Sequence, residues 1–171
     1  MANQDKEKSW KADLTFSKGC DLEEGLGRIS GLLRKMDVFL STVAGLGTDG
    51  GADLRLVCDE IGSNVVRHSS PSKTTRLEVL IEATDAIIRM RITDDGIAFN
   101  PFTQPLPYLG ADLDKRRVGG LGLHLIKQLF PLANYQRRDD CNISEVEYHM
   151  GDDGKERMRR SLDAHSADNM L

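Results

Sequence analysis

The chain has 171 residues, a length that suits one packed domain and is short for two. Its 23 lysines and arginines against 27 aspartates and glutamates give a formal net charge of -4, which argues against a general polyanion binder and so against direct nucleic-acid binding. The three cysteines are far apart and support neither a disulfide framework nor a zinc pair, so we interpret them as buried or idle thiols.

The two ends of the chain and its hydropathy predict the location of the protein and the extent of its folded domain. No signal-peptide pattern opens the chain, and no apolar run approaches the roughly 20 residues that span a bilayer. These features predict a cytoplasmic protein without a membrane segment. Residues 1–9 and 151–171 are polar, so we expect a flexible N-terminus and a polar C-terminal tail around a domain at 10–150.

The first predicted elements are a strand and a long helix. Residues 10–16 alternate enough to predict a strand. Apolar residues then recur at steps of four and three, which predicts a helix with an apolar stripe made of Leu22, Leu26, Ile29, Leu33, Met36, Leu40 and Val43. The stripe could be a coiled-coil seam for a partner, but packing on the domain's own sheet is the more common explanation.

A glycine-rich run from Ala44 to Ala52 separates this helix from the next one. The run lacks the Lys-Ser/Thr ending of a phosphate-binding P-loop, so we interpret it as a connector between helices. A second helix is predicted from Asp53 to the SSPSK break, with an apolar side made of Leu54, Val57, Cys58, Ile61 and Val65.

Residues 76–83 and 86–93 are rich in β-formers and are separated by two residues only, which predicts an antiparallel hairpin. In its second strand the alternating side chains point to opposite faces, with Ile88, Met90 and Ile92 on one face and Arg89, Arg91 and Thr93 on the other. One of these faces is expected to meet the core.

The rest of the chain completes a two-layer arrangement. Three prolines (Pro101, Pro105 and Pro107) predict a loop, and a third helix should run from about Gly120 to Phe130, stopped by Pro131. Strands around NYQRR and ISEVEYHM give the order β-α-α-β-β-α-β-β. We therefore expect an α+β fold, a two-layer α/β sandwich with a mixed, mostly antiparallel sheet and helices on one face.

Three motifs carry possible chemistry. Glu60, Asn64 and His68 form one row on the second helix, which either looks into a cleft or simply faces solvent. Asp94 and Gly96 end a strand, where the carboxylate can accept from an exocyclic amine or make an ordinary Asp-Gly turn. The third motif is a set of glycines that precede or open the third helix, where free N–H groups can face an anion or the glycines can serve packing: Gly119, Gly120 and Gly122.

In this order and at these separations, the three motifs resemble the N, G1 and G2 boxes of the GHKL (Bergerat-fold) ATPases. From about Asp13 to Met150 the chain is similar to the anti-sigma factor serine/threonine kinases of bacterial partner switching. The resemblance implies a GHKL-type fold with ATP and Mg²⁺ as cofactors. It makes Glu60 the general base and Asn64 the Mg²⁺ ligand, and it makes Asp94 the partner of the adenine amino group, with Gly96 letting the base approach.

The same resemblance assigns the remaining candidate residues. The loop from about Asn100 to Val118 would be an ATP lid. Nucleotide contacts are expected from Phe99, Gly119, Gly120, Leu121, Gly122 and Leu123, and candidate phosphate partners are Arg67, Lys115, Arg116 and Arg117, although a basic run on a loop is often only solvated. His68 could cap or pack the helix end, or touch the nucleotide.

The implied function is a serine/threonine protein kinase that phosphorylates a STAS-type anti-sigma factor antagonist and sequesters a regulatory partner such as a sigma factor. Family members often form homodimers, so a homodimer is one expected state. Where the family usually has Gly and Asp, this chain has Ala98 and Asn100, which keeps open a nucleotide-binding module that sequesters without phosphorylating. A histidine-kinase-like domain acting on a separate protein is a further alternative.

Overall fold

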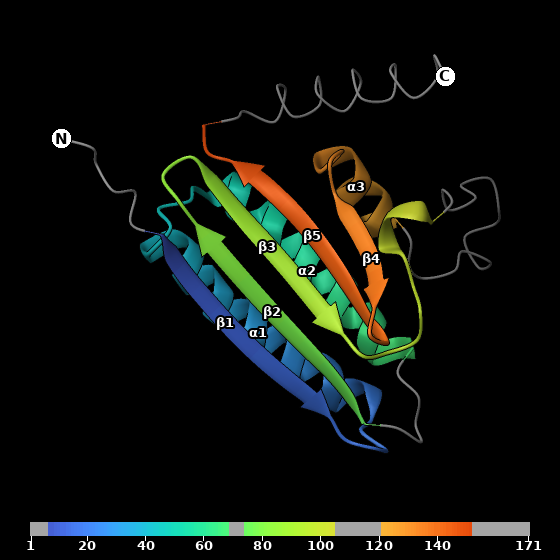
Figure 1. Ribbon diagram of the computed structural model, residues 1–171. Coiled ribbons are helices and arrows are strands. Elements are labelled where there is room, and N and C mark those ends of the chain that lie inside the picture. Colours follow the sequence, from blue (N-terminus) through green and yellow to red (C-terminus); the bar gives the residue numbers. More distant parts are fainter. Residues whose placement is uncertain (1–6, 69–73, 105–120, 152–171) are drawn as a thin grey trace, which may run out of the picture.

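The computed structural model describes residues 7–68, 74–104 and 121–151, which form one sheet with helices on one face (Figure 1). In chain order the elements are β1 (Lys8–Phe16), α1 (Leu22–Thr42), α2 (Thr48–His68), β2 (Thr75–Ala83), β3 (Ile87–Asp94), η1 (Pro101–Thr103), α3 (Leu121–Leu129), β4 (Asn134–Arg138) and β5 (Cys141–His149). The expected element order and the α+β class are confirmed.

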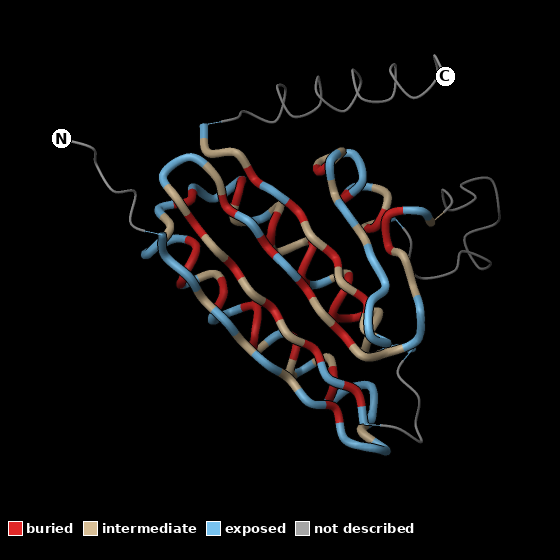
Figure 2. The backbone as a smooth tube through the Cα atoms, in the orientation of Figure 1, coloured by how far each residue is buried: buried red, intermediate tan, exposed pale blue. Residues whose placement is uncertain are grey.

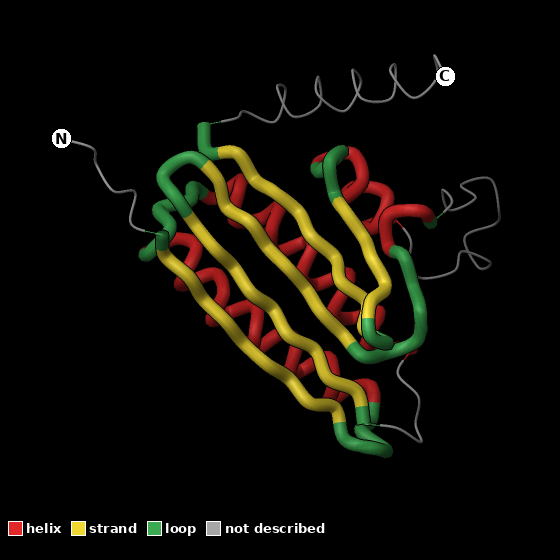
Figure 3. Tube along the Cα trace, in the orientation of Figure 1, coloured by secondary structure: helices red, strands yellow, loops and turns green. Residues whose placement is uncertain are grey.

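The five strands lie in the order β1-β2-β3-β5-β4 and form the single layer drawn in yellow in Figure 3. All four pairings are antiparallel, so the described sheet is antiparallel throughout and not mixed as expected. β5 pairs with β3, and this pairing brings Asn142 opposite Asp94. The C-terminal strand thereby reaches the motif at the end of β3.

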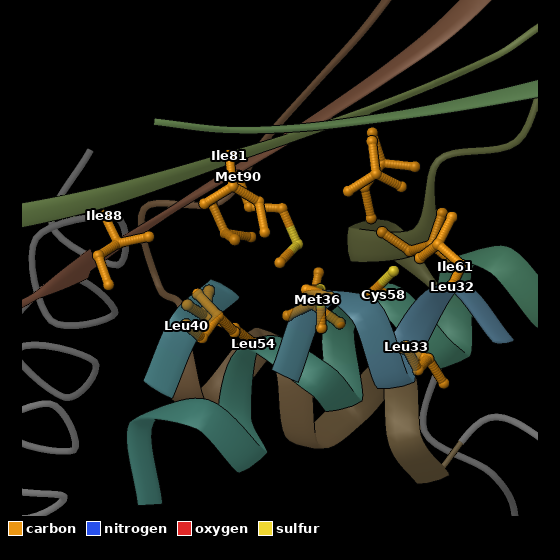
Figure 4. Close-up of a cluster of buried hydrophobic side chains, with 14 of the residues drawn as sticks. Leu32, Leu33, Met36, Leu40, Leu54, Cys58, Ile61, Ile81, Ile88 and Met90 are labelled. Carbon is orange, nitrogen blue, oxygen red and sulfur yellow. The ribbon is translucent and has the colours of Figure 1, made fainter. Parts of the chain in front are cut away.

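The core lies between the sheet and the two long helices. As predicted, Ile88, Met90 and Ile92 are at most 2% exposed, and the alternation of buried and exposed residues along the strands is visible in Figure 2. In Figure 4 apolar side chains of α1 and α2 point toward those of the sheet, such as Met36 and Met90. The stripe of α1 therefore packs on the chain's own sheet.

Four features of β1, α1, α2 and η1 differ from the predictions. Leu22 and Val43 are exposed because they lie at the two ends of α1. β1 begins at Lys8, two residues early, because this residue still pairs with Ala83 of β2. The prolines do not exclude every element, because Pro101 occupies the first turn of η1 and the Asn100 side chain accepts a hydrogen bond from the Phe102 N–H at 2.9 Å.

The fourth difference is that α2 begins at Thr48 and not at Asp53, so the predicted connector is partly helical. The Gly51 N–H already donates to the Gly47 carbonyl at 3.0 Å. A Cβ on Gly50 would overlap the ring of Tyr148, so glycine at this position lets the first turn of α2 pack closely on β5. Close packing explains Gly50, whereas Gly45 has a φ of +69° in the connector, a conformation that favours glycine.

Several predictions lie outside the described residues. They concern the flexibility expected of residues 1–6, the lid expected at residues 105–118 with Lys115, Arg116 and Arg117, the phosphate contacts expected of Gly119 and Gly120, and the polar tail expected from residue 152. Among the described helices, none has the length and apolar character needed to cross a membrane.

Candidate nucleotide-binding site

A pocket opens where the C-terminal half of α2 meets the end of β3 and the start of β5. Its walls are mostly apolar and carry a few converging polar groups, a combination typical of small-molecule sites. The lining residues are Ile61, Asn64, Val65, His68, Asp94, Gly96, Ile97, Phe99, Pro101, Asn142 and Ser144. Four predicted nucleotide contacts are among them, namely Asn64, Asp94, Gly96 and Phe99.

Asp94 is the carboxylate of this pocket and is 7% exposed. Its Oδ1 accepts hydrogen bonds from the Gly96 N–H at 2.9 Å and from the Asn142 side-chain amide at 2.9 Å. Burial raises the pKa of Asp94, while the donors Asn142 and Gly96 and the nearby Arg137 act in the opposite direction. A Cβ on Gly96 would stand 2.8 Å from Oδ1, so this turn needs glycine to approach the carboxylate.

Asn64 and His68 lie on the opposite wall, on α2. The buried side-chain nitrogen of Asn64 has no hydrogen-bond partner within the described part of the chain, although burying an amide without a partner is costly. The ring of His68 stacks on Phe99, with centroids 6.4 Å apart and planes at 25°. His68, the last residue of α2, is thus part of the pocket wall and packs there against Phe99. Its contact with a nucleotide stays a prediction.

Glu60 lies one helical turn before Asn64, beside the pocket and not in its lining. Its carboxylate rests against the first turn of α3, where a Cβ on Gly122 would overlap it. Partial burial raises the pKa of Glu60, and the negative charge of Asp59 adds to this, while the positive charge of Arg67 lowers it. The structure therefore joins the first and third motifs by direct contact.

The other residues predicted on α2 and α3 do not line the pocket. Arg67 is exposed, and its positive charge lowers the pKa of Glu60. Leu121 is 55% exposed, and the side chain of Leu123 is buried in the core. Their contacts with phosphate stay predictions, as do those of Gly119, Gly120 and Arg117.

The main residue that sequence reasoning missed is Asn142, which lies 4% exposed beside Asp94. We expected the last strand around ISEVEYHM, which left Asn142 outside it, whereas β5 begins at Cys141. On the observed strand Asn142 shares the buried alternation of Ser144, Val146 and Tyr148. The sequence did contain a signal: Asn142 and Ser144 are polar residues at the alternate positions that Val146 and Tyr148 identify as the buried face of the strand.

Few side chains of the described residues offer ligands for a divalent cation at this site. No group of three or more His, Cys, Asp or Glu side chains that could hold a metal ion exists among residues 7–68, 74–104 and 121–151. Mg²⁺ bound to a nucleotide needs few protein ligands, because phosphate and water oxygens supply most of them. The unpartnered nitrogen of Asn64 is a donor that suits a phosphate oxygen of such a complex, while only the side-chain oxygen of Asn64 could bind the cation.

Two comparisons with known proteins show what this chain is similar to. The family model described as the histidine kinase-like ATPase domain matches residues 24–154. The chain is also 32% identical over 97 residues to the serine/threonine-protein kinase BtrW of Bordetella bronchiseptica. That alignment covers 56% of this chain and 68% of the relative.

Proposed function

This chain belongs to the histidine kinase-like ATPase domain family, in agreement with its resemblance to the GHKL anti-sigma factor kinases, and from that premise we propose that it is an ATP-dependent serine/threonine protein kinase. One observation carries the proposal: Asp94 and Asn64 face each other across one pocket, and Glu60 lies one helical turn away against the start of α3. The name of the similar Bordetella protein supports the choice of a protein hydroxyl as acceptor.

The base of ATP would bind between the apolar walls of the pocket. Asp94 can accept a hydrogen bond from the amino group of adenine, while Ile61, Val65 and Ile97 cover the faces of the ring. A buried carboxylate discriminates strongly between an amino group and a carbonyl, because the carbonyl would leave the charge unpaired.

The phosphates would extend along α2 toward Glu60 and α3. Asn64 is the residue that would hold Mg²⁺ through its side-chain oxygen, and its side-chain nitrogen, unpartnered among the described residues, would be free to donate to a phosphate oxygen. When bound, Mg²⁺ supplies neutralisation of the phosphate charge. The N–H groups of the first turn of α3, which begins at Leu121, have no partner within the helix and would bind the phosphates.

Glu60 would act as general base. It takes the proton of the acceptor hydroxyl while the oxygen attacks the γ-phosphorus and the bond to the β-phosphate oxygen breaks, leaving ADP. Burial raises the pKa of Glu60, which makes its carboxylate a stronger base than an exposed one. The Arg67 charge opposes that rise and keeps the ionised form available.

We propose further that the acceptor is a STAS-type anti-sigma factor antagonist and that the chain also sequesters a regulator such as a sigma factor, as a homodimer. The family resemblance supports these partners. A sequestering module without kinase activity is the alternative suggested by Ala98 and Asn100. Asn100 nevertheless caps η1 through its side-chain oxygen, a role that an aspartate would also fill, and neither residue touches Glu60 in a described contact.

The test is phosphate transfer from labelled ATP with Mg²⁺ to a STAS protein encoded beside this chain. We expect transfer by the wild type and a loss of about 10²-fold or more in Glu60→Gln, with ADP binding unchanged. The matched control is Glu147→Gln, on the outer face of β5, which should transfer normally. ADP binding without transfer by the wild type would favour the sequestering module.

A further inference from the structure

Asn142 connects the pocket's carboxylate to the neighbouring loop and strand. Its side-chain nitrogen donates to Asp94 Oδ1 at 2.9 Å and to the Ile97 carbonyl at 2.7 Å. Its side-chain oxygen accepts from the Tyr135 hydroxyl at 2.8 Å, from the Arg137 guanidinium at 2.8 Å and from the Phe99 N–H at 3.3 Å. A buried amide with all its hydrogen-bonding capacity used holds one orientation.

This arrangement decides which oxygen of Asp94 is left for a ligand. Both hydrogen bonds that Asp94 receives from the described residues reach Oδ1, one from Asn142 and one from the Gly96 N–H. Two donors on one oxygen fix the plane of the carboxyl group. The second oxygen, Oδ2, then remains as the acceptor for a donor group in the pocket that Asp94 lines.

The same amide also holds the loop between β3 and η1. Its contacts with the Ile97 carbonyl and the Phe99 N–H fix the backbone at two points, and Arg137 donates to the Gly96 carbonyl at 3.0 Å. Ile97 and Phe99 are apolar walls of the pocket. One side chain on β5 therefore sets the position of both the polar and the apolar part of the base site.

We propose that Asn142 is the positioning residue that makes this pocket select a base with an exocyclic amino group. By holding Oδ1, it directs Oδ2 of Asp94 at the amino group and so penalises a carbonyl at that place. The inference rests on nucleotide binding under the proposed function, but not on phosphate transfer.

The sharpest probe pair is ADP and IDP: in IDP a carbonyl replaces the amino group at carbon 6 of the base, and N1 carries a proton. For the full-length wild type we expect calorimetry to give a clear preference for ADP. Asn142→Ala removes the donor to Oδ1 and should reduce that preference about tenfold. Tyr135→Phe is the matched control, because it removes one donor to Asn142 and leaves both bonds donated by Asn142 in place.

Asn142→Asp separates positioning from a loss of structure. The introduced carboxyl keeps the acceptor for Tyr135 and Arg137 but faces Asp94 with a second negative charge. At pH 8 we expect at least about tenfold weaker ADP binding than wild type. As the pH is lowered, the two carboxyls come to share one proton, which restores a donor to Oδ1, so the ratio to wild type should shrink. The other charged or titratable groups around the pair are common to both proteins; they are Asp95, Tyr135, Arg137 and His68.

The outcomes distinguish the claims. A pH-independent ratio for Asn142→Asp, or an unchanged ADP preference in folded Asn142→Ala, would overturn the positioning role alone. If Asn142→Asp does not fold, the ADP and IDP comparison on Asn142→Ala decides. ADP binding without transfer to the STAS protein overturns the kinase proposal and leaves this inference standing. A wild type that binds no ADP overturns both.

Discussion

Strands β3 and β5 carry two polar clusters in one antiparallel ladder, and the clusters differ in their burial. On the outer face, Arg89 pairs with Glu147 and Arg91 with Glu145, each at 2.6 Å, and three of these four side chains are more than 40% exposed. On the helix side, Asp94 and Asn142 are 7% and 4% exposed.

The difference shows how burial changes the free energy that polar side chains contribute. Exposed ion pairs gain little, because water and salt screen the charges and the side chains lose freedom. The buried pair must satisfy its hydrogen bonds internally, so each donor or acceptor removed there has a large effect. Four changes test this contrast.

The largest effect is expected from Gly122→Ala, at the contact between α3 and Glu60. The added methyl group overlaps the Glu60 carboxylate and must displace it, which should lower phosphate transfer by about 10- to 100-fold while ADP affinity changes little. The matched control is Gly27→Ala on α1. A Cβ at Gly27 meets nothing within 4 Å, so this substitution should stabilise the fold by about 0.5 kcal/mol. Normal transfer by Gly122→Ala would argue that the position of Glu60 does not matter.

The second effect is expected from Asp94→Asn in the pocket. The amide lacks the charge that strengthens a hydrogen bond from the adenine amino group, so ADP should bind about tenfold more weakly in calorimetry. Asp13→Asn, on β1 and exposed, is the control and should bind normally. Equal affinities of the two variants would remove Asp94 from base recognition.

A smaller effect concerns stability and pH at Glu60. Its pKa is raised above the ordinary 4.5, so the folded state holds the proton more tightly than the unfolded state. The stability linked to this proton is present below about pH 4.5 and is lost as the pH rises through the raised value. Glu60→Gln should therefore gain stability over wild type at pH 8, by less than about 1 kcal/mol because solvent screens the group, and the gain should vanish near pH 4 in urea unfolding. A gain that is independent of pH would have another cause.

The smallest effect is expected on the outer face. A double-mutant cycle of Arg91→Met and Glu145→Gln should give a coupling free energy of about 0.5 kcal/mol or less that falls as salt is added. Urea unfolding at low and high salt measures it. A coupling of about 2 kcal/mol would contradict the contrast between the two faces.

Local patterns in the sequence predicted most of the fold. The alternation of Ile88, Met90 and Ile92 and the stripe on α1 identified core faces, because the spacing of apolar residues directly reflects the period of a strand or helix. The predicted starts of α2 and β5 were a few residues too late in the chain. Those boundaries depend on contacts between distant segments, such as Gly50 against Tyr148, which no local pattern contains.

The candidate site divides in the same way. The four-residue spacing of Glu60 and Asn64 and the pair Asp94 and Gly96 were recognisable, because each motif lies within one element or turn. The arrangement of these motifs in space was not recognisable from the sequence. Asp94 is separated from Asn142 by the whole segment between β3 and β5, and only the antiparallel pairing of those strands places the two side chains in contact.

The sequence by itself determined the helices, the strands and the three motifs, because these depend on side chains a few residues apart. The tertiary structure decided that Asn64 faces the pocket, that Glu60 rests against Gly122 and that Asn142 holds Asp94. The physical reason is that burial and hydrogen-bond partners arise only when distant segments pack together, and those two quantities give a polar side chain its role.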